Sequence, residues 1–570
     1  MAINSFKKRL AIIGGGPSGL YLFKKLLDSG RTDLDIDIFE KKKEPGAGMP
    51  YSHEGANTEH IANVSANEIP EIVTPVLAWI QTVSKEKLKR FDLKPEDFNK
   101  YRVLPRLLLG DYLNDQFDLL LQKAARAGIT AKVHLKSLVT DITDIPEIQQ
   151  VSVETESEDH FRFDHVVICT GHHWPIVHEG KIPGYFDSPY PPAKLAIKIN
   201  HPVAIKGSSL TAIDAISTVA THNGSFVRNE EGKLTYKANK DSKDSKLVLH
   251  SIDGLLPAIR FHLEDPGVAE RSRLSKETLQ KNMAENNGFV SLDFVFHVDF
   301  MEPLRERDPD FHAKVKDLSL EEFVNRVMDQ RERIDPFLLF KAEYKEAEKS
   351  IRRKESIHWK EMLANLSFAM NYPAKHFSAE DMQRLVNVLK PLISIVIASV
   401  PQESADEIIA LYDAGKLEMV AVDADSKVKP KEEGGITYFY TDENKVARQT
   451  SYQTFIDCTG QPQLSLKDFP FKSMRDQGTI SQARLAFRSQ EAAIKEISNG
   501  NEDVQQQSNG KYYLKVPGIA ITDDFQVVDK NGTANNRIYV IAVPFIGGYN
   551  PDYSGLDFCD EASRIILESL

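Results

Sequence analysis

The chain begins with an apolar segment that runs directly into glycine. Residues 10–13 are Leu-Ala-Ile-Ile, and Gly14-Gly15-Gly16-Pro17-Ser18-Gly19 follow. A short apolar run that ends at turn residues is typical of a buried strand. Helical spacing of apolar positions then extends from about Pro17 to Leu27, and residues 34–39 form a second apolar run that ends at Glu40. The pattern predicts a strand, a glycine turn, a helix and a second strand.

The glycines of this turn have the spacing G-x-G-x-x-G. Gly14 permits the tight turn, Gly16 lets a pyrophosphate approach the backbone, and Gly19 lets the helix pack closely on the strand. Glu40 stands where an acid would bind ribose hydroxyls, which favours FAD or NAD over NADP. An ordinary glycine turn is the alternative, but the ordered series of elements favours a dinucleotide site.

A similar but less complete pattern returns near residue 200. Residues 202–206 are mainly apolar and precede Gly207-Ser208-Ser209-Leu210-Thr211-Ala212. Only the first glycine of the spacing is kept, although Ser and Ala are small enough for close packing. We therefore predict a second nucleotide-type turn. The alternative is a Rossmann-like unit that packs but binds nothing.

Two buried strands end in the same three residues. Cys169-Thr170-Gly171 closes one and Cys458-Thr459-Gly460 closes the other, and both mark sharp exits that face a cofactor. A last strand over residues 537–543 leads through a glycine-containing loop into a closing helix. The end of the chain is thus expected to complete the fold that its beginning starts.

Residues 264–400 are mostly helical and charged, and they interrupt the α/β pattern. The predicted fold class is α/β, with two Rossmann-like dinucleotide-binding domains, the first of them discontinuous, and a helical insertion. The expected division assigns 1–190 and 436–570 to an FAD-binding domain, 191–263 and 401–435 to an NAD(P)H-binding domain, and 264–400 to the insertion.

Composition narrows the function classes. The 570 residues carry a net charge of −12 and are 41% hydrophobic, which fits a folded protein with several cores and argues against nucleic acid as a partner. The chain enters its first strand too soon for a signal peptide, and its longest apolar run, 391–400, is too short to span a bilayer. We expect a cytoplasmic protein without membrane contact. The three cysteines are far apart, so neither a C-x-x-C dithiol nor a metal site is expected.

The order of these motifs resembles that of flavoproteins with two dinucleotide-binding domains. The segments 46–52, 62–64, 105–113 and 207–214 are similar to bacterial FAD/NAD(P)-binding proteins related to flavin-dependent monooxygenases. The exit Cys169-Thr170-Gly171-His172-His173-Trp174-Pro175 resembles that of N-hydroxylating, Baeyer-Villiger and flavin-containing monooxygenases. The resemblance implies FAD, NADPH or NADH, a small-molecule substrate and O2, and it allows a homo-oligomer.

The resemblance also implies site residues. For FAD they are Gly14, Gly16, Pro17, Ser18, Gly19, Glu40, Lys41, Gly48, Met49, Pro50, Tyr51, Asn63, Arg106, Val139, Thr170, Gly171, Gly547, Gly548 and Leu556. For the nicotinamide cofactor they are Gly207, Ser208, Ser209, Leu210, Thr211 and Ser251. The chain departs from the family pattern at Ala542-Val543-Pro544, where relatives carry glycine or an acid, and at Ile252, where relatives carry arginine. NADPH is favoured over NADH without being fixed.

The expected activity is oxygenation of a small molecule, with N-hydroxylation of an amine or amino acid as the favoured reaction and oxidation of aspartate to nitrosuccinate as one form of it. The cofactor would carry the chemistry, so no catalytic residue is fixed. The candidates are His60, Arg102, His172 and His173, although each histidine could equally be a structural hydrogen-bonding group. Two alternatives stay open: an NAD(P)H-flavin oxidoreductase that does not oxygenate, and a non-enzymatic flavin-binding regulatory protein.

Overall fold

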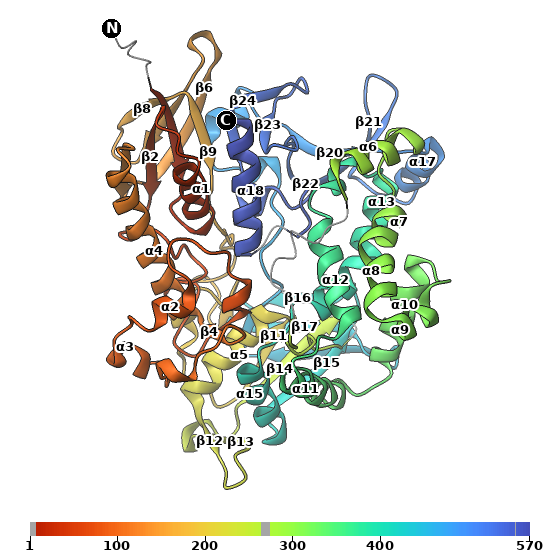
Figure 1. The fold of residues 1–570 in the computed structure, drawn as a ribbon. Coiled ribbons are helices and arrows are strands. Elements are labelled where there is room, and N and C mark those ends of the chain that lie inside the picture. The colour runs from red at the N-terminus through yellow and green to blue at the C-terminus, as the bar shows by residue number, and fades with distance from the viewer. Residues whose placement is uncertain (1–6, 253, 264–273, 553–554) are drawn as a thin grey trace.

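The computed structural model describes residues 7–252, 254–263, 274–552 and 555–570. Two parallel sheets, each with its own helices, lie beside a region built almost entirely of helices (Figure 1). The predicted fold class is therefore confirmed. The first ten residues of the expected insertion, 264–273, lie outside the described residues.

The first sheet is built from both ends of the chain. Its strand order is β23-β24-β9-β1-β2-β5, and all neighbours are parallel except β23 against β24. The strands are β1 (Lys8–Ile13), β2 (Leu34–Glu40), β5 (Ala131–Leu135), β9 (His165–Ile168), β23 (Gln526–Val528) and β24 (Ala534–Val540). Helix α1 (Pro17–Asp28) packs against α4 (Arg106–Arg126) and against the closing helix α18 (Leu556–Ser569) (Figure 1).

The first unit folds this way because four consecutive residues of its central strand are apolar. Residues 10–13 of β1 are all buried, as a parallel strand covered on both faces requires. Pro17 starts α1, where its missing amide hydrogen costs nothing. A Cβ on Gly19 would lie 2.1 Å from the Gly14 carbonyl oxygen, which confirms the close contact between helix and turn.

The second sheet is parallel throughout, in the order β10-β19-β11-β14-β15. Its strands are β10 (Tyr185–Phe186), β11 (Pro202–Lys206), β14 (Lys246–Ile252), β15 (Leu417–Val422) and β19 (Thr454–Asp457). Helices α5 (Leu210–Asn223) and α15 (Gln402–Asp413) pack together in this unit.

A small antiparallel sheet covers part of the second unit. Its strands are β16 (Lys427–Pro430), β17 (Ile436–Thr441) and β18 (Ala447–Tyr452). Tyr438 and Tyr452 from this sheet form a buried cluster with Val248 of β14 and Phe455 of β19. The ring of His250, also on β14, stacks on Tyr438 with centroids 4.2 Å apart.

Strand pairing divides the chain differently from the expected boundary at residue 436. Residues 436–457 belong with the second sheet, because Phe455 pairs with Ala204 and β17 packs over the same cluster. The two strands that end in Cys-Thr-Gly lie in different sheets, β9 in the first and β19 in the second. The motifs look alike in sequence because the two units are built alike, so the motif alone does not say which unit a strand joins.

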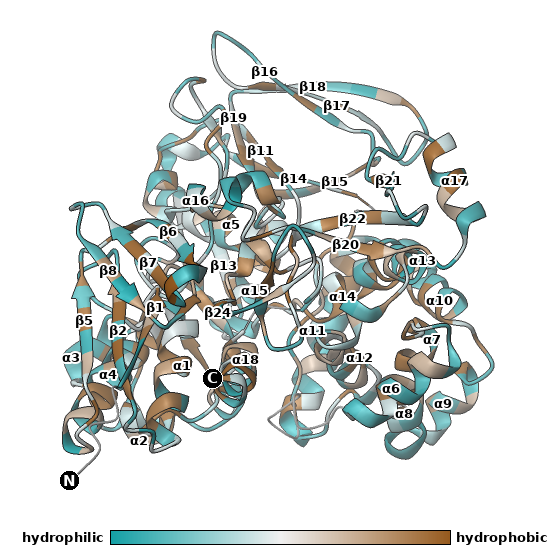
Figure 2. Cartoon of the chain, turned by 90° about the horizontal axis from the view of Figure 1, so that it is seen from above, coloured by the Kyte–Doolittle hydropathy of each residue, from teal (hydrophilic) through white to brown (hydrophobic). Residues whose placement is uncertain are grey.

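The helical region lies between β14 and β15 in the chain. Its helices are α6 (Lys276–Glu285), α7 (Leu292–Phe296), α8 (Glu302–Arg307), α9 (Pro309–Val315), α10 (Leu320–Glu332), α11 (Pro336–Arg353), α12 (His358–Ala369), α13 (Ala379–Arg384) and α14 (Lys390–Val396). Figure 2 shows mostly hydrophilic residues on the outer helices α8 and α9. The helical region contacts the end of the chain through Ser367 Oγ and an Asp552 carboxylate oxygen, 2.6 Å apart.

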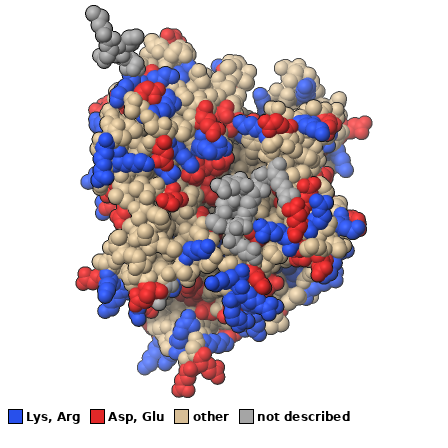
Figure 3. Space-filling model, in the orientation of Figure 1, with Lys and Arg blue, Asp and Glu red and all other residues tan. Residues whose placement is uncertain are grey.

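The remaining elements lie outside the two large sheets and the helical region. They are β3 (Ile61–Ser65), β4 (Val103–Pro105), β6 (Val139–Ile145), β7 (Gln150–Thr155), β8 (His160–Phe163), β12 (Gly224–Arg228), β13 (Leu234–Ala238), β20 (Gln482–Ala486), β21 (Val504–Gln506), β22 (Tyr512–Ile519), α2 (Val76–Ile80), α3 (Lys85–Lys89), α16 (Lys472–Asp476) and α17 (Gln490–Ser498). In the described ranges, every helix is too short or too polar to cross a bilayer. Lys and Arg side chains are mixed with Asp and Glu over the face in Figure 3.

Candidate dinucleotide site

A cavity of about 510 Å³ opens where the strands of the first sheet end. This volume is within the range of about 300–1,000 Å³ that is usual for ligand pockets. The glycine turn after β1, the loop after β2, the exit after β9 and the start of α18 form its walls. Of the residues predicted to bind FAD, those that line it are Gly14, Gly16, Pro17, Ser18, Glu40, Lys41, Gly48, Met49, Pro50, Tyr51, Val139, Thr170, Gly171 and Leu556.

Two glycines of the turn hold positions that a side chain could not share. Gly14 has a φ of +109°, and a Cβ there would lie 2.8 Å from the Cys169 carbonyl oxygen. A Cβ on Gly16 would lie 3.2 Å from Gly48 Cα across the turn. No side chain caps α1, so its first amides remain available to the phosphates of a ligand. The turn is therefore shaped as a cradle for a pyrophosphate.

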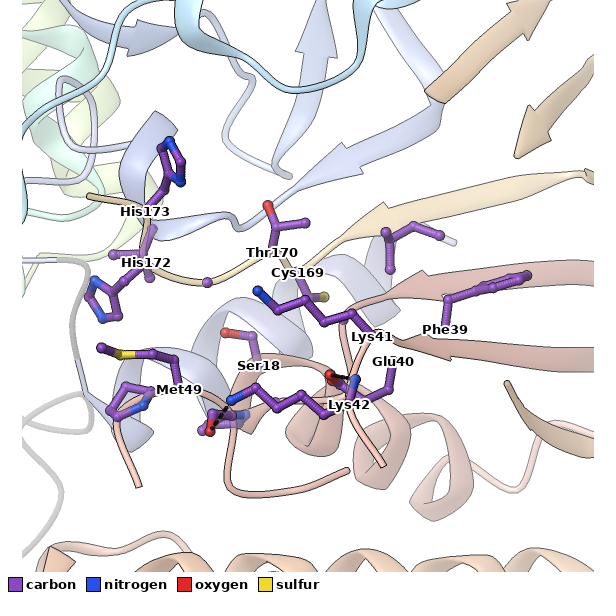
Figure 4. A pocket seen from close by; sticks show the side chains of 18 of the residues that line it. Ser18, Phe39, Glu40, Lys41, Lys42, Met49, Cys169, Thr170, His172 and His173 are labelled. Carbon is purple, nitrogen blue, oxygen red and sulfur yellow. Dashed lines mark hydrogen bonds between the residues drawn. The ribbon is translucent and has the colours of Figure 1, made fainter. Parts of the chain in front are cut away.

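Glu40 borders the cavity at the end marked by Phe39 and Lys41 (Figure 4). One carboxylate oxygen accepts the Gly15 amide and the other accepts the Lys42 amide, each at 2.9 Å. An ionised carboxylate has about four acceptor sites. Glu40 is thus fixed by the backbone and still has acceptor capacity for ribose hydroxyl groups.

Thr170 supplies a polar atom that the described protein leaves unpartnered. Its Oγ1 is buried and has no hydrogen-bond partner among the described residues, although Thr170 borders the cavity. Buried polar atoms are nearly always hydrogen-bonded in native proteins. The glycine cradle, the uncapped helix, Glu40 and this hydroxyl together fit a bound dinucleotide.

Sequence reasoning missed several residues of the cavity wall. Lys42 Nζ donates to the Gly48 carbonyl oxygen and to Ser52 Oγ, both at 3.1 Å, and orders the loop that follows β2. The other lining residues that were not predicted include Leu138, Asp468, Phe471, Phe545 and Cys559. They come from distant parts of the chain, so no local motif could have identified them. Lys42 lies two residues after the predicted acid and could have been found from that position.

Arg106 lies elsewhere, at the contact between the two units. Its guanidinium contacts both carboxylate oxygens of Asp214 on α5, at 2.6 and 3.0 Å, and both side chains are largely buried. Burial by itself would raise the pKa of Asp214, but the adjacent Arg106 keeps that pKa below its ordinary value. Tyr190 Oη also donates to Asp214, at 2.6 Å. Arg106 therefore joins the units and does not border the cavity.

Other predicted residues also lie outside the cavity lining. His60 is buried at the same contact, where its Nδ1 accepts the Asn57 amide and its Nε2 lies 2.9 Å from Thr218 Oγ1. His60 thus has the hydrogen bonds that a structural histidine would make. Arg102 lies over the Phe98 ring at 5.4 Å, and the exposed Asn63 accepts a hydrogen bond from Arg260 at its carbonyl oxygen. Gly548 packs on the Pro517 carbonyl, and Gly19 and Gly547 are also absent from the lining.

His172 and His173 do border the cavity. His172 Nδ1 lies 3.3 Å from Gln461 Oε1, and the His173 amide donates to the same oxygen at 2.9 Å. Burial lowers the pKa of His172. Figure 4 shows His172 beside Met49, at the end of the cavity opposite Phe39. Gln461 belongs to the exit of the second unit, so the two exits meet at this end.

The second turn repeats the geometry of the first. Gly207 has a φ of +98°, and a Cβ there would lie 2.8 Å from the Cys458 carbonyl oxygen. The Gly207 amide donates to the His250 carbonyl at 2.8 Å, as the Gly14 amide donates to Phe39 at 2.9 Å. Ser251 therefore occupies the position that Glu40 holds in the first unit.

The side chains around the second turn differ from those around the first. Ser208 Oγ lies 2.9 Å from Ser251 Oγ and donates to the Leu255 carbonyl oxygen at 2.6 Å. Ser209 occupies the N-cap of α5, followed by Leu210 and Thr211. The second turn thus has serine hydroxyl groups at Ser251 and at residues 208–209. The first turn has a carboxylate at Glu40 and glycines at residues 15–16.

Two family models match this chain, one in the first unit and one in the helical region. Residues 11–173 match the FAD-NAD(P)-binding family, and residues 275–397 match the YdhS-like middle domain. Over 474 residues the chain is 31% identical to the uncharacterized protein YdhS of Escherichia coli (strain K12), an alignment that covers 82% of this chain and 86% of that protein. The first unit is thus an FAD-NAD(P)-binding domain, as predicted.

Two solved structures align with nearly the whole chain at low identity. The ornithine hydroxylase PvdA of Pseudomonas aeruginosa aligns over 99% of this chain and 98% of its own, with 10% identity and a TM-score of 0.48. The FAD-bound cadaverine monooxygenase DfoA of Erwinia amylovora aligns over 99% and 94%, with 12% identity and a TM-score of 0.44.

Proposed function

Because the chain belongs to the family of YdhS and its first unit is an FAD-NAD(P)-binding domain, we propose that it is an FAD-dependent oxidoreductase that uses NAD(P)H. The cavity carries this proposal, because it joins a pyrophosphate cradle, a fixed ribose acid and an unpartnered hydroxyl. Bound FAD would supply hydride acceptance and reaction with O2. The protein would bind it, orient it and exclude water.

The residues divide this work along the cavity. Gly14, Gly16 and the first amides of α1 would hold the pyrophosphate, and Glu40 the adenosine ribose. Met49 and His172 would lie near the reactive end. Phe471 and Phe545 are buried apolar residues of the cavity wall, and they would limit access of water to the bound cofactor.

We assign the nicotinamide cofactor to the second turn and favour NADPH over NADH there. A carboxylate at the end of the second strand of a Rossmann unit binds the 2′-hydroxyl of NAD and repels the 2′-phosphate of NADP. Ser251 holds this position in the second unit. The second turn therefore lacks the group that would exclude the phosphate.

The finer proposal is oxygenation of a small molecule, with N-hydroxylation of an amine or amino acid as the favoured reaction. The resemblance of segment 169–175 to the exit of N-hydroxylating, Baeyer-Villiger and flavin-containing monooxygenases supports it. The helical region contacts the chain end at Asp552, close in sequence to Leu556 of the cavity wall. This contact makes the helical region a candidate wall of the substrate site.

The test begins with the chromophore of the purified protein. We expect a yellow protein whose flavin band bleaches with NADPH in the absence of O2. NADPH and O2 consumption would then be followed across a panel of amines and amino acids, aspartate included. A hydroxylated product would support oxygenation, whereas stoichiometric H2O2 with every compound would favour the oxidoreductase without oxygenation. No bleaching would favour a regulatory flavoprotein, and failure to take up FAD would overturn the proposal.

A further inference from the structure

The reactive end of the cavity is held by a residue from the other unit. Gln461 follows Thr459-Gly460 at the end of β19, in the second sheet. Its amide contacts His172 and His173, which follow Thr170-Gly171 at the end of β9 in the first sheet. Trp174 Nε1 also donates to the Gly460 carbonyl oxygen at 3.1 Å. The segments that follow β9 and β19 are therefore hydrogen-bonded to each other.

The hydrogen bonds of Gln461 fix the orientation of its amide. Nε2 donates to the His173 carbonyl at 2.7 Å and to the Pro462 carbonyl at 2.9 Å. A primary amide has two N–H donors, so both are used. Oε1 must then be the atom that faces His172, and it accepts the His173 amide as well.

The orientation of the amide dictates the tautomer of His172. Since Oε1 only accepts, the Nδ1 atom 3.3 Å away must carry the hydrogen. Burial lowers the pKa of His172, which favours the neutral ring. A neutral ring protonated at Nδ1 has a lone pair at Nε2. His172 also lies near Trp174, with ring centroids 5.4 Å apart, which limits its rotation.

We propose that Gln461 is a positioning residue that holds His172 as the Nδ1–H tautomer, so that Nε2 presents a hydrogen-bond acceptor to the reactive end of the cavity. The group that it would recognise is an N–H or O–H donor of the bound cofactor or substrate. This inference rests on the proposed function for the identity of that ligand. The tautomer itself is a property of the protein alone.

The first experiment reads the tautomer directly. Full-length protein with ¹⁵N-labelled histidine is compared with His172→Gln, which identifies the His172 signals. We expect an unprotonated signal from Nε2 and a protonated one from Nδ1 at pH 7. Gln461→Ala should shift the ring toward the Nε2–H form, whereas Gln461→Glu keeps an acceptor oxygen and should keep the Nδ1–H form. The reverse assignment in the wild type, or no change in Gln461→Ala, would overturn the proposal.

The second experiment measures FAD dissociation constants by flavin fluorescence. Loss of one hydrogen bond corresponds to about a tenfold change. We expect Gln461→Ala and His172→Ala each to weaken binding about tenfold, and the double variant to be no weaker, because one residue acts through the other. The exposed Gln81→Ala is the control and should leave the constant unchanged. Additive losses would contradict the inference. If no FAD binds, the proposed function fails while the tautomer experiment still decides the inference.

Discussion

The glycine turns of the two units have similar backbone geometry and different neighbouring side chains. In each, a glycine with positive φ follows the first strand, and its missing Cβ leaves room for the carbonyl of a cysteine in a Cys-Thr-Gly exit. The first unit then places Glu40 beside its turn, and the second places Ser251 at the same position. The comparison teaches that the two units keep the same backbone geometry at the turn and differ in the side chain after the second strand. Under the proposed function, that side chain would select the nucleotide.

The contact between the units should give the largest effect. Arg106→Ala leaves the Asp214 carboxylate buried without its cation, and loss of one partner of a buried ion pair costs about 3–5 kcal/mol of unfolding free energy. Chemical denaturation at pH 7 measures this change. Arg448→Ala, which removes a surface ion pair with Asp442, is the control and should cost far less, because surface ion pairs contribute little to stability. Equal effects of the two variants would show that the contact does not hold the units together.

Acid should destabilise the second unit through His250. Burial lowers the pKa of His250 to about 4, below the ordinary value of about 6.5. Between these values the unfolded chain binds more protons than the folded one, so stability falls as pH falls through this window. At about 1.4 kcal/mol per pKa unit, the loss is about 3 kcal/mol. His250→Phe keeps an aromatic ring against Tyr438 and should remove this part of the pH dependence, measured as urea midpoints from pH 7 to pH 4. An unchanged pH profile would contradict the assignment.

The two glycines test whether each turn serves its own ligand. A Cβ at position 14 or 207 would meet a backbone carbonyl at 2.8 Å with φ positive, a strain of about 1–3 kcal/mol. Gly14→Ala should weaken FAD binding about ten- to hundredfold, and Gly207→Ala should raise the KM for NADPH while FAD stays bound.

Matched controls are available for both glycines. Gly30 and Gly232 also have positive φ but no atom within 4 Å of an added Cβ. Gly30→Ala and Gly232→Ala should therefore leave both ligands bound almost as in the wild type. If Gly207→Ala also leaves the KM for NADPH unchanged, the second unit packs without serving as a nucleotide site.

The smallest effect is expected at the position where the units differ. Ser251→Asp restores an acid in the second turn and should shift the ratio of KM values toward NADH by about tenfold. Ser251→Ala removes the hydroxyl without adding charge and should keep the preference of the wild type. Steady-state KM values for both cofactors measure the ratio. The same ratio in all three proteins would show that Ser251 does not face the 2′ position.

The local sequence pattern was enough to predict the parts of the fold whose residues are neighbours both in the sequence and in the structure. The Gly14 to Glu40 segment, the turn at Gly207 and the mainly helical character of 276–396 follow from periodicity and turn chemistry, and the structure confirms them. Pairing between distant strands was harder. Residues 436–457 were expected in the first unit, since nothing in a buried strand ending in Cys-Thr-Gly states which sheet it joins.

Some residues of the candidate site could also be predicted from the local sequence, and others could not. Residues beside the glycine turn could be predicted because the motif places them there. Arg106 could not be separated from a phosphate ligand, since an arginine at a helix start serves either role and only the fold reveals Asp214 opposite it. Phe471, Phe545 and Cys559 reach the cavity from the last quarter of the chain, and tertiary packing alone brings them there.

The junction of α1 with α18 has a consequence for synthesis on the ribosome. The cavity needs Leu556 and Cys559 from α18, so its wall is incomplete until α18 has been synthesised. At about 5–20 residues per second, α18 is synthesised roughly half a minute to two minutes after the glycine turn. The nascent chain must keep α1 and β1 from aggregating during that time, and a ligand of this cavity can be enclosed only after α18 has been made.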